Sequence, residues 1–227
     1  MDNEKITSTL SKDKNLIPND IMIDIETGGL NPGCVVFTFG ARVFDRNGNI
    51  VENPFYMRIR KSSCLEVGLK CEDQTMSWWN KNFADDSIEK MEVFSEELER
   101  HNLKEVLLKF NDFFKEHNCK CVWAKGPDFD CVILKHAYNA CNLNPPWKYN
   151  DLRDVRTVID LDKCLLKVDK SYGHFKMSKN KLRESKNDED TTNNKKVIHH
   201  ALNDCDIQIN QIIDFLMYVN ITKDEML

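Results

Sequence analysis

Near its start the chain reads Ile21-Met22-Ile23-Asp24-Ile25-Glu26-Thr27-Gly28-Gly29, an apolar run that ends in two carboxylates and a pair of glycines. A β-branched run of this kind predicts a short buried strand. Because side chains alternate along a strand, Asp24 and Glu26 face the same side. Two like charges so close repel unless a cation lies between them or one takes up a proton, and a hard divalent metal meets that need. A solvent-exposed acidic strand end is the alternative, and this pair alone does not decide.

The sequence around this stretch predicts an α/β fold. Two further β-rich runs at residues 34–44 and 50–59 flank an Asn-Gly turn, which indicates a hairpin. After about residue 73 the apolar period becomes helical, and a run that predicts a buried strand, residues 119–124, lies between two helices. A last long helix is predicted from about Ala201 to Tyr218. The faces of the two earlier helices are formed by Leu103, Val106, Leu107, Phe110 and Phe114, and by Phe129, Val132, Ile133, His136, Ala137 and Ala140. Strands followed by helices that alternate with strands predict a layered sheet of mixed direction.

The chain is predicted to form one domain with polar segments outside its core. Its 227 residues are 41% hydrophobic and 30% charged, which is typical of a soluble globular protein. We predict a flexible N-terminal tail at 1–17, a single domain at 18–220 and a C-terminal tail at 221–227. Residues 176–196 contain almost no apolar side chains and predict a long mobile insertion. The lysines of this insertion are either simply solvated or contact a nucleic-acid backbone.

Composition narrows the classes of function. No stretch approaches the ~20 apolar residues of a membrane span, and the polar N-terminus lacks the apolar core of a secretory signal, so an intracellular, cytoplasmic protein without a membrane partner is expected. The nine cysteines are odd in number and include no Cys-x-x-Cys pair, which favours reduced core cysteines over disulfides or zinc. A net charge of −5 excludes a general basic footprint for nucleic acid. Any polyanionic partner must be held locally, for example through bound divalent cations.

A second candidate segment is the predicted strand-to-helix turn Trp123-Ala124-Lys125-Gly126-Pro127-Asp128-Phe129-Asp130. Asp128 stands where helix N-caps are favoured, so capping is its expected role. Asp130 lies two residues further on. It is either a first-turn acid favoured by the helix dipole or a carboxylate presented to a site at the carboxyl end of the strand.

The third candidate segment, His199-His200-Ala201-Leu202-Asn203-Asp204, opens the last predicted helix. Five residues turn about 140° on an ideal helix, so His199 and Asp204 would not share a face if both were helical. His199 is therefore expected on the loop side of the helix start. A mobile histidine beside a fixed carboxylate suits a general base that closes on substrate, whereas a plain surface histidine pair is the alternative.

Together the three segments supply four carboxylates and one histidine. Two divalent ions about 3.5–4 Å apart, held by shared carboxylates, can stabilise the attacking and leaving oxygens of a phosphoryl displacement. A histidine can take the proton of the attacking water. The set therefore predicts catalytic residues Asp24, Glu26, Asp130, His199 and Asp204.

The order of these residues resembles the DEDDh 3′-5′ exonuclease superfamily, which has a ribonuclease H-like fold. Within it, the chain is most similar to the branch of the phage DexA exonuclease and the bacterial exoribonuclease RNase AS, the Rv2179c-like branch. The similarity spans about residues 20–217. Further matches are Thr75-Met76-Ser77-Trp78-Trp79, the segment from Trp123 to Tyr138, and Asn150-Asp151-Leu152-Arg153-Asp154-Val155-Arg156-Thr157. The resemblance implies a ribonuclease H-like mixed sheet with helices on both faces.

The resemblance also implies a reaction and roles for the residues. A member of this branch releases nucleoside 5′-monophosphates from the free 3′ end of RNA or DNA with two Mg²⁺ or Mn²⁺ ions, and a homodimer is expected. It implies that Asp24 bridges both metals, that Glu26 and Asp204 bind the metal that activates water, that Asp130 holds the second metal and that His199 is the general base. Implied substrate contacts are Thr27, Gly28, Trp78, Trp79, Arg153 and Arg156. One of the tryptophans could instead belong to the core, and the arginines could form a structural salt-bridge network. His200 receives no role.

Other readings of the acidic strand fail or remain open. The run Asp24-Ile25-Glu26-Thr27-Gly28 superficially resembles the Asp-Thr-Gly motif of aspartic proteases, but Glu26 interrupts it and no second copy occurs. A dehalogenase-type phosphatase would need aspartate at position 26. A catalytically silent exonuclease-like module that binds nucleic acid or a protein remains the alternative function.

Overall fold

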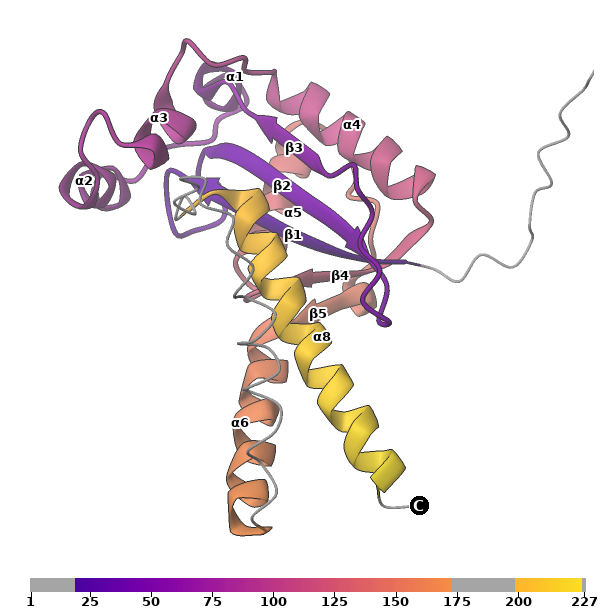
Figure 1. The fold of residues 1–227 in the computed structure, drawn as a ribbon. Coiled ribbons are helices and arrows are strands. Elements are labelled where there is room, and N and C mark those ends of the chain that lie inside the picture. The colour runs from indigo at the N-terminus through magenta and orange to yellow at the C-terminus, as the bar shows by residue number, and fades with distance from the viewer. Residues whose placement is uncertain (1–18, 173–198, 226–227) are drawn as a thin grey trace, which may run out of the picture.

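One mixed sheet organises the molecule. The computed structural model describes residues 19–172 and 199–225, with side chains at 19–163 and 199–219. Over this part of the chain five strands lie in the order β3-β2-β1-β4-β5. Their bounds are Asn19–Thr27 for β1, Val36–Phe44 for β2, Phe55–Arg58 for β3, Cys119–Ala124 for β4 and Leu152–Asp154 for β5. The central strand β1 is antiparallel to β2 and parallel to β4 (Figure 1). The predicted α/β class with a mixed sheet is confirmed.

Helices cover both faces of this sheet, also as predicted. Their bounds are Lys61–Glu66 for α1, Asp73–Asn82 for α2, Ile88–Phe94 for α3, Leu103–Glu116 for α4, Asp130–Ala140 for α5, Val155–Tyr172 for α6 and Ala201–Glu225 for α8, with a short 3₁₀ helix at Tyr149–Asp151. The larger apolar core joins α4 and α5 to one face. The smaller core joins α8 and the start of α6 to the other face. Figure 1 shows α8 crossing the sheet on its near side.

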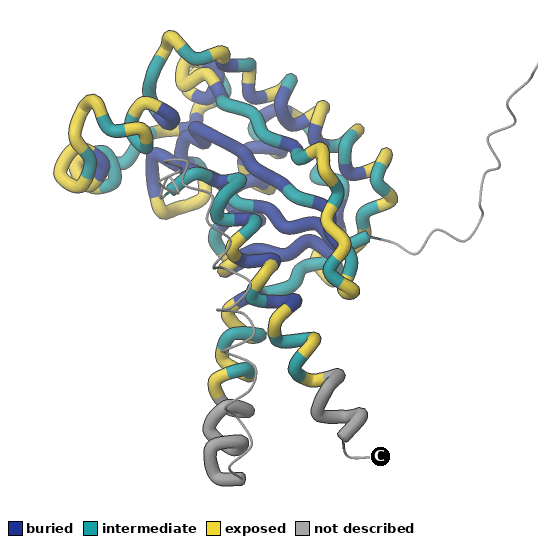
Figure 2. Tube along the Cα trace, in the orientation of Figure 1, coloured by how far each residue is buried: buried dark blue, intermediate teal, exposed yellow. Residues whose placement is uncertain are grey.

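Strand β1 divides its side chains between the two cores. Ile21, Ile23 and Ile25 belong to the larger core, whereas Met22 belongs to the smaller one under α8. Because strand side chains alternate, Asp24 and Glu26 face the α8 side together with Met22. Figure 2 shows that the central strands are mostly buried. The acidic pair therefore lies near the carboxyl end of β1 beneath α8, with Glu26 buried and Asp24 half-buried, and not at a fully solvated strand end.

Gly40 allows α8 to approach the sheet closely. It pairs with Asp24 across β1 and β2. A Cβ atom at this position would lie 2.7 Å from the carbonyl carbon of Ala201, closer than side-chain carbons approach backbone. The Cys205 thiol donates to the carbonyl oxygens of Met22 and Gly40 at 3.6 and 3.7 Å. The start of α8 thus rests directly on β1, which carries the acidic pair, and on its neighbour β2.

Several predicted bounds and faces need correction. Strand β3 covers only part of 50–59, because Ile50 forms an isolated bridge to Phe44 and regular pairing begins at Phe55. On α5, Val132 and His136 are exposed, and the buried face instead contains Cys131, Ile133, Leu134, Ala137 and Tyr138. The predicted face of α4 is confirmed in full. Helix α8 continues to Glu225, so part of the predicted C-terminal tail is helical.

Other sequence predictions fall differently. Of the cysteines that the structure describes, all are free and most are buried, as expected. None of the helices in the described part is long and apolar enough to cross a membrane. The predicted N-terminal tail at 1–17, the insertion at 176–196 and the side chain of Cys164 lie outside the described residues.

Candidate active site

The first part of the site is the acidic pair of β1. Glu26 is 7% exposed, and burial is the main reason that its pKa rises to about 8, with further contributions from Asp204 and Asp130. Burial also raises the pKa of Asp24 well above its usual value, and the charges of Asp130, Glu26 and Asp204 add to this rise. The carboxylates therefore repel one another in a region of low solvent access.

Asp130 joins this pair from the loop between β4 and α5. The loop turns through Gly126, whose φ of +107° favours glycine, and Asp130 is the first residue of α5. Asp130 is 5% exposed, and burial raises its pKa to about 7, opposed by hydrogen bonds from its own backbone and that of Ile25. Phe129, not Asp128, is the N-cap residue, and it makes no side-chain cap hydrogen bond. The expected capping role of Asp128 is wrong, because the helix begins one residue later.

The third part comes from the start of α8. Asp204 lies in the first turn of the helix, while His199 precedes the helix with a φ of +56°. His199 is thus on the loop side of the helix start, as predicted. One ligand atom from each of Glu26, His199 and Asp204 lies within 4.8 Å of the other two. Residues that are far apart in sequence therefore meet at one end of the sheet.

Gln208 is a polar neighbour of the site that sequence reasoning missed. It is buried, and its side-chain Nε2 donates to Asp24 Oδ1 at 3.1 Å. Gln208 lies one helical turn after Asp204, so the two side chains share a face of α8. That spacing was a usable signal, because any residue four positions after a helical ligand points toward the same site.

Aromatic rings surround His199. The ring centroid of His199 lies 5.4 Å from Trp78, 6.0 Å from Trp79 and 5.6 Å from Phe83, each in an edge-to-face arrangement. Trp79 is buried and its indole N–H donates to the carbonyl oxygen of Thr27 at 3.2 Å, whereas Trp78 is 41% exposed. Such edge contacts are favourable for aromatic rings. Helix α2 therefore forms one wall beside the histidine and the loop that follows β1.

Of the remaining predicted substrate contacts, some are hydrogen-bonded within the fold and one is largely exposed. The Gly28 N–H donates to the carbonyl oxygen of Val35, and the Thr27 hydroxyl donates to that of Gly29. Arg153 Nη1 donates to two backbone carbonyl oxygens, those of Asn150 and Leu152. Arg156 is largely exposed.

Arg156 lies close to the second acidic segment. One of its terminal nitrogens is 3.6 Å from Asp128 Oδ1. Its guanidinium lies over Gly126, where an added Cβ would meet it at 1.9 Å. The charge of Arg156 also lowers the pKa of Asp130, although burial dominates that group. Arg156 is therefore a cation at the edge of an otherwise acidic site.

The donor set fits hard divalent cations. Asp24, Glu26, Asp130 and Asp204 offer carboxylate oxygens from three segments. Burial raises the pKa values of the first three, and repulsion from the neighbouring carboxylates adds to the rise at Asp24 and Glu26. Oxygen ligands are those that Mg²⁺ and Mn²⁺ prefer. A bound cation would compensate the repulsion that the protein alone leaves in place.

Comparisons with a family model and with solved structures each found matches to this chain. The family model of the 3′-5′ exoribonuclease Rv2179c-like domain matches residues 19–215. Among solved structures, E. coli exonuclease I in complex with a 5cy-dA13 oligonucleotide is 11% identical, with 89% of this chain and 42% of that chain covered and a TM-score of 0.51. The E. coli exonuclease I complex with a dT13 oligonucleotide is 14% identical over 66% of this chain and 30% of that chain, with a TM-score of 0.47.

These matches differ in what they establish. The chain spans less than half of the length of exonuclease I, and the likeness to the complex with the 5cy-dA13 oligonucleotide, at 11% identity, shows a shared fold alone. No curated protein sequence matches the chain. The family model, however, covers nearly the whole described part. The predicted ribonuclease H-like fold is confirmed, and the description of the family agrees with the predicted enzyme class. The chain belongs to the 3′-5′ exoribonuclease Rv2179c-like domain family.

Proposed function

We propose that this protein hydrolyses RNA from its free 3′ end and releases nucleoside 5′-monophosphates with the help of two divalent metal ions, Mg²⁺ or Mn²⁺. The observation that carries the proposal is the meeting of four carboxylates and His199 from three distant segments at one end of the sheet. The ribonuclease preference rests on the description of the family. DNA remains the comparison substrate, because exonuclease I structures contain DNA oligonucleotides.

The acidic residues would hold the metal ions. The charges of Asp130, Glu26 and Asp204 all act on Asp24, which suits a ligand shared by two ions. Glu26 and Asp204 lie together beside His199, and Asp130 approaches from the other segment. When bound, the ions would neutralise the phosphate charge and stabilise the attacking and leaving oxygens.

His199 is proposed as the general base. Its imidazole lies next to Glu26 and Asp204, and a neutral imidazole can accept a proton near neutral pH. In the proposed step a water oxygen attacks the terminal phosphorus and His199 takes the proton of that water. The bond between phosphorus and the 3′ oxygen breaks, and this oxygen takes up a proton from solvent. The shortened strand keeps a 3′-hydroxyl, and the released nucleotide carries the 5′-phosphate.

Substrate contacts follow from the exposure of the predicted residues. We propose that Trp78 stacks on a base and that Arg156 pairs with a backbone phosphate, because both present exposed groups at the site. Trp79 and Arg153 are assigned structural roles, since Trp79 is buried and Arg153 is bonded to backbone carbonyls. The backbone near Thr27 and Gly28 would line the position of the terminal nucleotide.

The deciding experiment uses 5′-labelled RNA and DNA oligonucleotides of the same sequence, single-stranded or duplex, with Mg²⁺ or Mn²⁺. We expect stepwise shortening of RNA from the 3′ end, release of 5′-monophosphates, and no cleavage in excess EDTA. A substrate blocked by a 3′-phosphate and the variant Asp204→Asn serve as controls. Sustained cleavage in EDTA would contradict the metal mechanism. Retention of oligonucleotides without shortening under either metal would support the silent binding module instead.

A further inference from the structure

His200 lies directly beside the proposed general base, yet the proposed reaction gives it no role. Its side chain is 19% exposed and stacks on the ring of Tyr56, with centroids 4.6 Å apart and planes inclined by 15°. Its Nε2 atom lies 3.9 Å from Glu92 Oε1. His200 Nδ1 is buried without a hydrogen-bond partner. A side chain this well enclosed is part of the structure and not a surface histidine.

The partners of His200 form a rigid platform. Arg58 donates to both oxygens of Glu92, at 2.6 and 3.0 Å, and the Tyr56 hydroxyl also donates to Glu92. Although burial opposes it, these hydrogen bonds hold the pKa of Glu92 below its usual value. A two-pronged contact between arginine and carboxylate fixes geometry more tightly than a single hydrogen bond. The platform joins β3 to α3 and offers the flat face of Tyr56 to His200.

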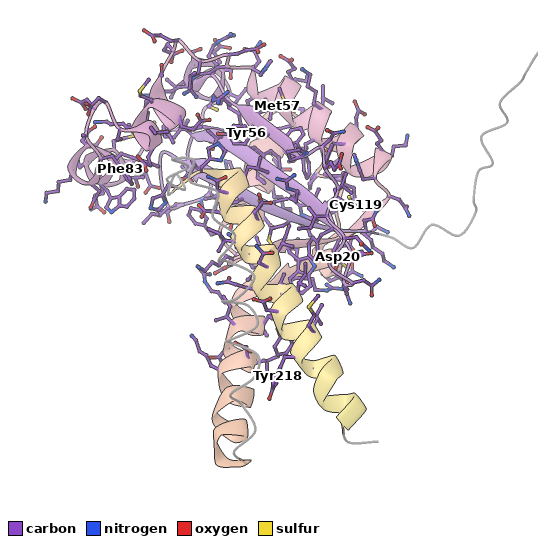
Figure 3. The ribbon with its side chains drawn as sticks, in the orientation of Figure 1. Asp20, Tyr56, Met57, Phe83, Cys119 and Tyr218 are labelled. Carbon is purple, nitrogen blue, oxygen red and sulfur yellow. The ribbon has the colours of Figure 1, made fainter. Side chains whose placement is uncertain are left out.

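The platform lies in the same cross-strand row as the acidic pair. Tyr56 pairs with Gly40, and Gly40 pairs with Asp24. Ala201 packs on Gly40, so the preceding residue, His200, falls over Tyr56. Figure 3 shows Tyr56 and Phe83 at the same end of α8, far from Asp20. The start of α8 therefore has one anchor on each of two neighbouring strands.

His199 needs such an anchor, because its backbone adopts a conformation that residues with a side chain rarely take. Its φ of +56° lies in the left-handed region, which persists in a non-glycine residue when its surroundings impose it. On one side its ring meets Trp78, Trp79 and Phe83. On the other side the chain continues at once into the stacked His200.

We propose that His200 is a positioning residue whose stack on Tyr56, beside Glu92, fixes the backbone at 199–200 and so holds the His199 ring next to Glu26 and Asp204. This inference rests on the proposed role of His199 and adds the element that places it. Small displacements of a catalytic group are expensive, since about 1 Å can cost roughly a hundredfold in rate. Loss of the stack should therefore lower kcat and leave KM unchanged.

Substitutions can separate positioning from general stability. His200→Ala and Tyr56→Leu each remove the stack and should lower kcat by roughly ten- to a hundredfold with KM within twofold. His200→Phe and Tyr56→Phe keep the stacked rings and should retain kcat within about threefold. His117→Ala is the matched control, because His117 also packs on an aromatic ring, Phe113 at 4.3 Å, but at the C-terminal end of α4. It should leave kcat and KM unchanged.

Two further readouts identify the path through His199. In the background of His199→Ala, His200→Ala should cause almost no additional loss of kcat, because a residue that acts through another loses its effect when that one is absent. In the metal-free protein, the ring proton resonances of His199, assigned by their loss in His199→Ala, should move toward the values of an exposed histidine in His200→Ala. They should stay in place in His200→Phe.

The outcomes are separable from those of the proposed function. If the wild type cleaves no oligonucleotide, the proposed function fails, and the resonance shift still tests the positioning. If the wild type is active but His200→Ala and Tyr56→Leu keep full kcat, the inference is overturned. It is also overturned if the two histidine effects multiply in full, or if the His199 resonances do not move. Should His200→Ala not fold, Tyr56→Leu gives the same decision.

Discussion

The two faces of strand β1 carry opposite kinds of side chain although they belong to one short segment. On one face Ile21, Ile23 and Ile25 pack into the large core beside α4 and α5. On the other, Asp24 and Glu26 lie under α8 with pKa values raised chiefly by burial. Burial of apolar side chains stabilises the fold, whereas burial of like charges opposes it.

The contrast teaches how the fold tolerates its acidic face. Interactions outside the carboxylate cluster hold α8 in place. Arg42 donates to both oxygens of Asp206 on α8 at 2.9 and 3.1 Å, and Cys205 rests on the strand backbone. The small core under α8 adds buried apolar contacts. The isoleucine face of β1 therefore contributes mainly to stability, and the acidic face carries the proposed chemistry. Substitutions on the two faces should have different effects.

The largest effect is expected from Asp24→Asn. It keeps the shape of the side chain but removes a charge that metal ions require, so kcat should fall on the order of a thousandfold or more. The Tm of the metal-free protein should stay the same or rise, because the pKa of Asp24 is raised in the fold. Activity assays and thermal melts measure both quantities.

Asp20→Asn is the matched control for that substitution. Asp20 lies on the same face of β1 but at the far end of the sheet, where it pairs with Arg46 at 2.8 Å (Figure 3). Asp20 is buried but Arg46 is half-exposed, so the loss of this charged hydrogen bond should cost about 1–3 kcal/mol of stability and leave kcat unchanged. Equal losses of activity in the two variants would show that the acidic face as a whole, and not the cluster at one end, supports the reaction.

On the opposite face, Ile23→Ala should reverse this pattern. Ile23 is completely buried, so its truncation should lower the free energy of unfolding by about 2–5 kcal/mol. At a temperature where the variant remains folded, kcat should stay within a fewfold of the wild type. Denaturant unfolding and single-temperature kinetics measure the two effects. A thousandfold loss of kcat in folded Ile23→Ala would contradict the separation of the two faces.

A smaller effect is expected from pH in the absence of metal. Folding raises the pKa of Glu26 from 4.5 to about 8 and that of Asp130 from 3.8 to about 7, chiefly through burial. The folded state therefore holds protons that the unfolded state releases. The associated stability is full below about pH 4 and is lost as pH rises through 7 and 8. In EDTA, Tm should fall between pH 6 and 8.5, with roughly 2–4 °C for each kcal/mol lost.

Metal should flatten this pH dependence. Ions bind the deprotonated carboxylates, so saturating Mg²⁺ should raise Tm most at high pH, and the apparent metal affinity should increase with pH. Glu26→Gln should flatten the profile in EDTA without metal. The argument fails if the melting profiles in EDTA and in Mg²⁺ run parallel across this range.

The smallest effect separates the two arginines at the far side of the site. Arg156→Ala removes an exposed cation and should raise KM by about three- to tenfold, with a weaker dependence of KM on salt. Arg153→Ala removes hydrogen bonds to backbone carbonyls, so it should lower Tm by a few degrees and change KM little. Kinetics at two salt concentrations tests both. A larger KM change in Arg153→Ala than in Arg156→Ala would contradict this assignment of roles.

Much of the fold could be predicted because its main elements have clear periods. The alternation of β1 and the apolar face of α4 are visible in the sequence, and both are confirmed. Helices α1 and α3 and strand β5 were not predicted, because they are short and leave many side chains exposed or half-buried. The 18-residue helix α6 was also missed. Strand β5 has three residues, and its hydrogen bonds to β4 define it more than its composition does. Short elements of this kind depend on tertiary contacts that periodicity does not reveal.

The site was accessible to sequence reasoning only in part. Acidic and histidine residues indicate possible metal binding and proton transfer from the sequence alone, and the structure brings Glu26, His199 and Asp204 together. Their catalytic roles remain predictions. The supporting residues were missed for a physical reason: Tyr56 and Glu92 act through stacking and hydrogen bonds across elements that are distant in sequence. Only the structure shows that such ordinary residues meet.

Gly40 illustrates a consequence for mutational surveys of this protein. It offers no functional group, yet any side chain there would push the first turn of α8 away from the sheet. Since that turn carries Asp204, a scan for loss of function would score position 40 like a ligand. A scan that also measured abundance would still misclassify Gly40→Ala if the protein kept its fold with a displaced helix. Sensitivity to substitution at this position reports a distance between two backbones and not a chemical role.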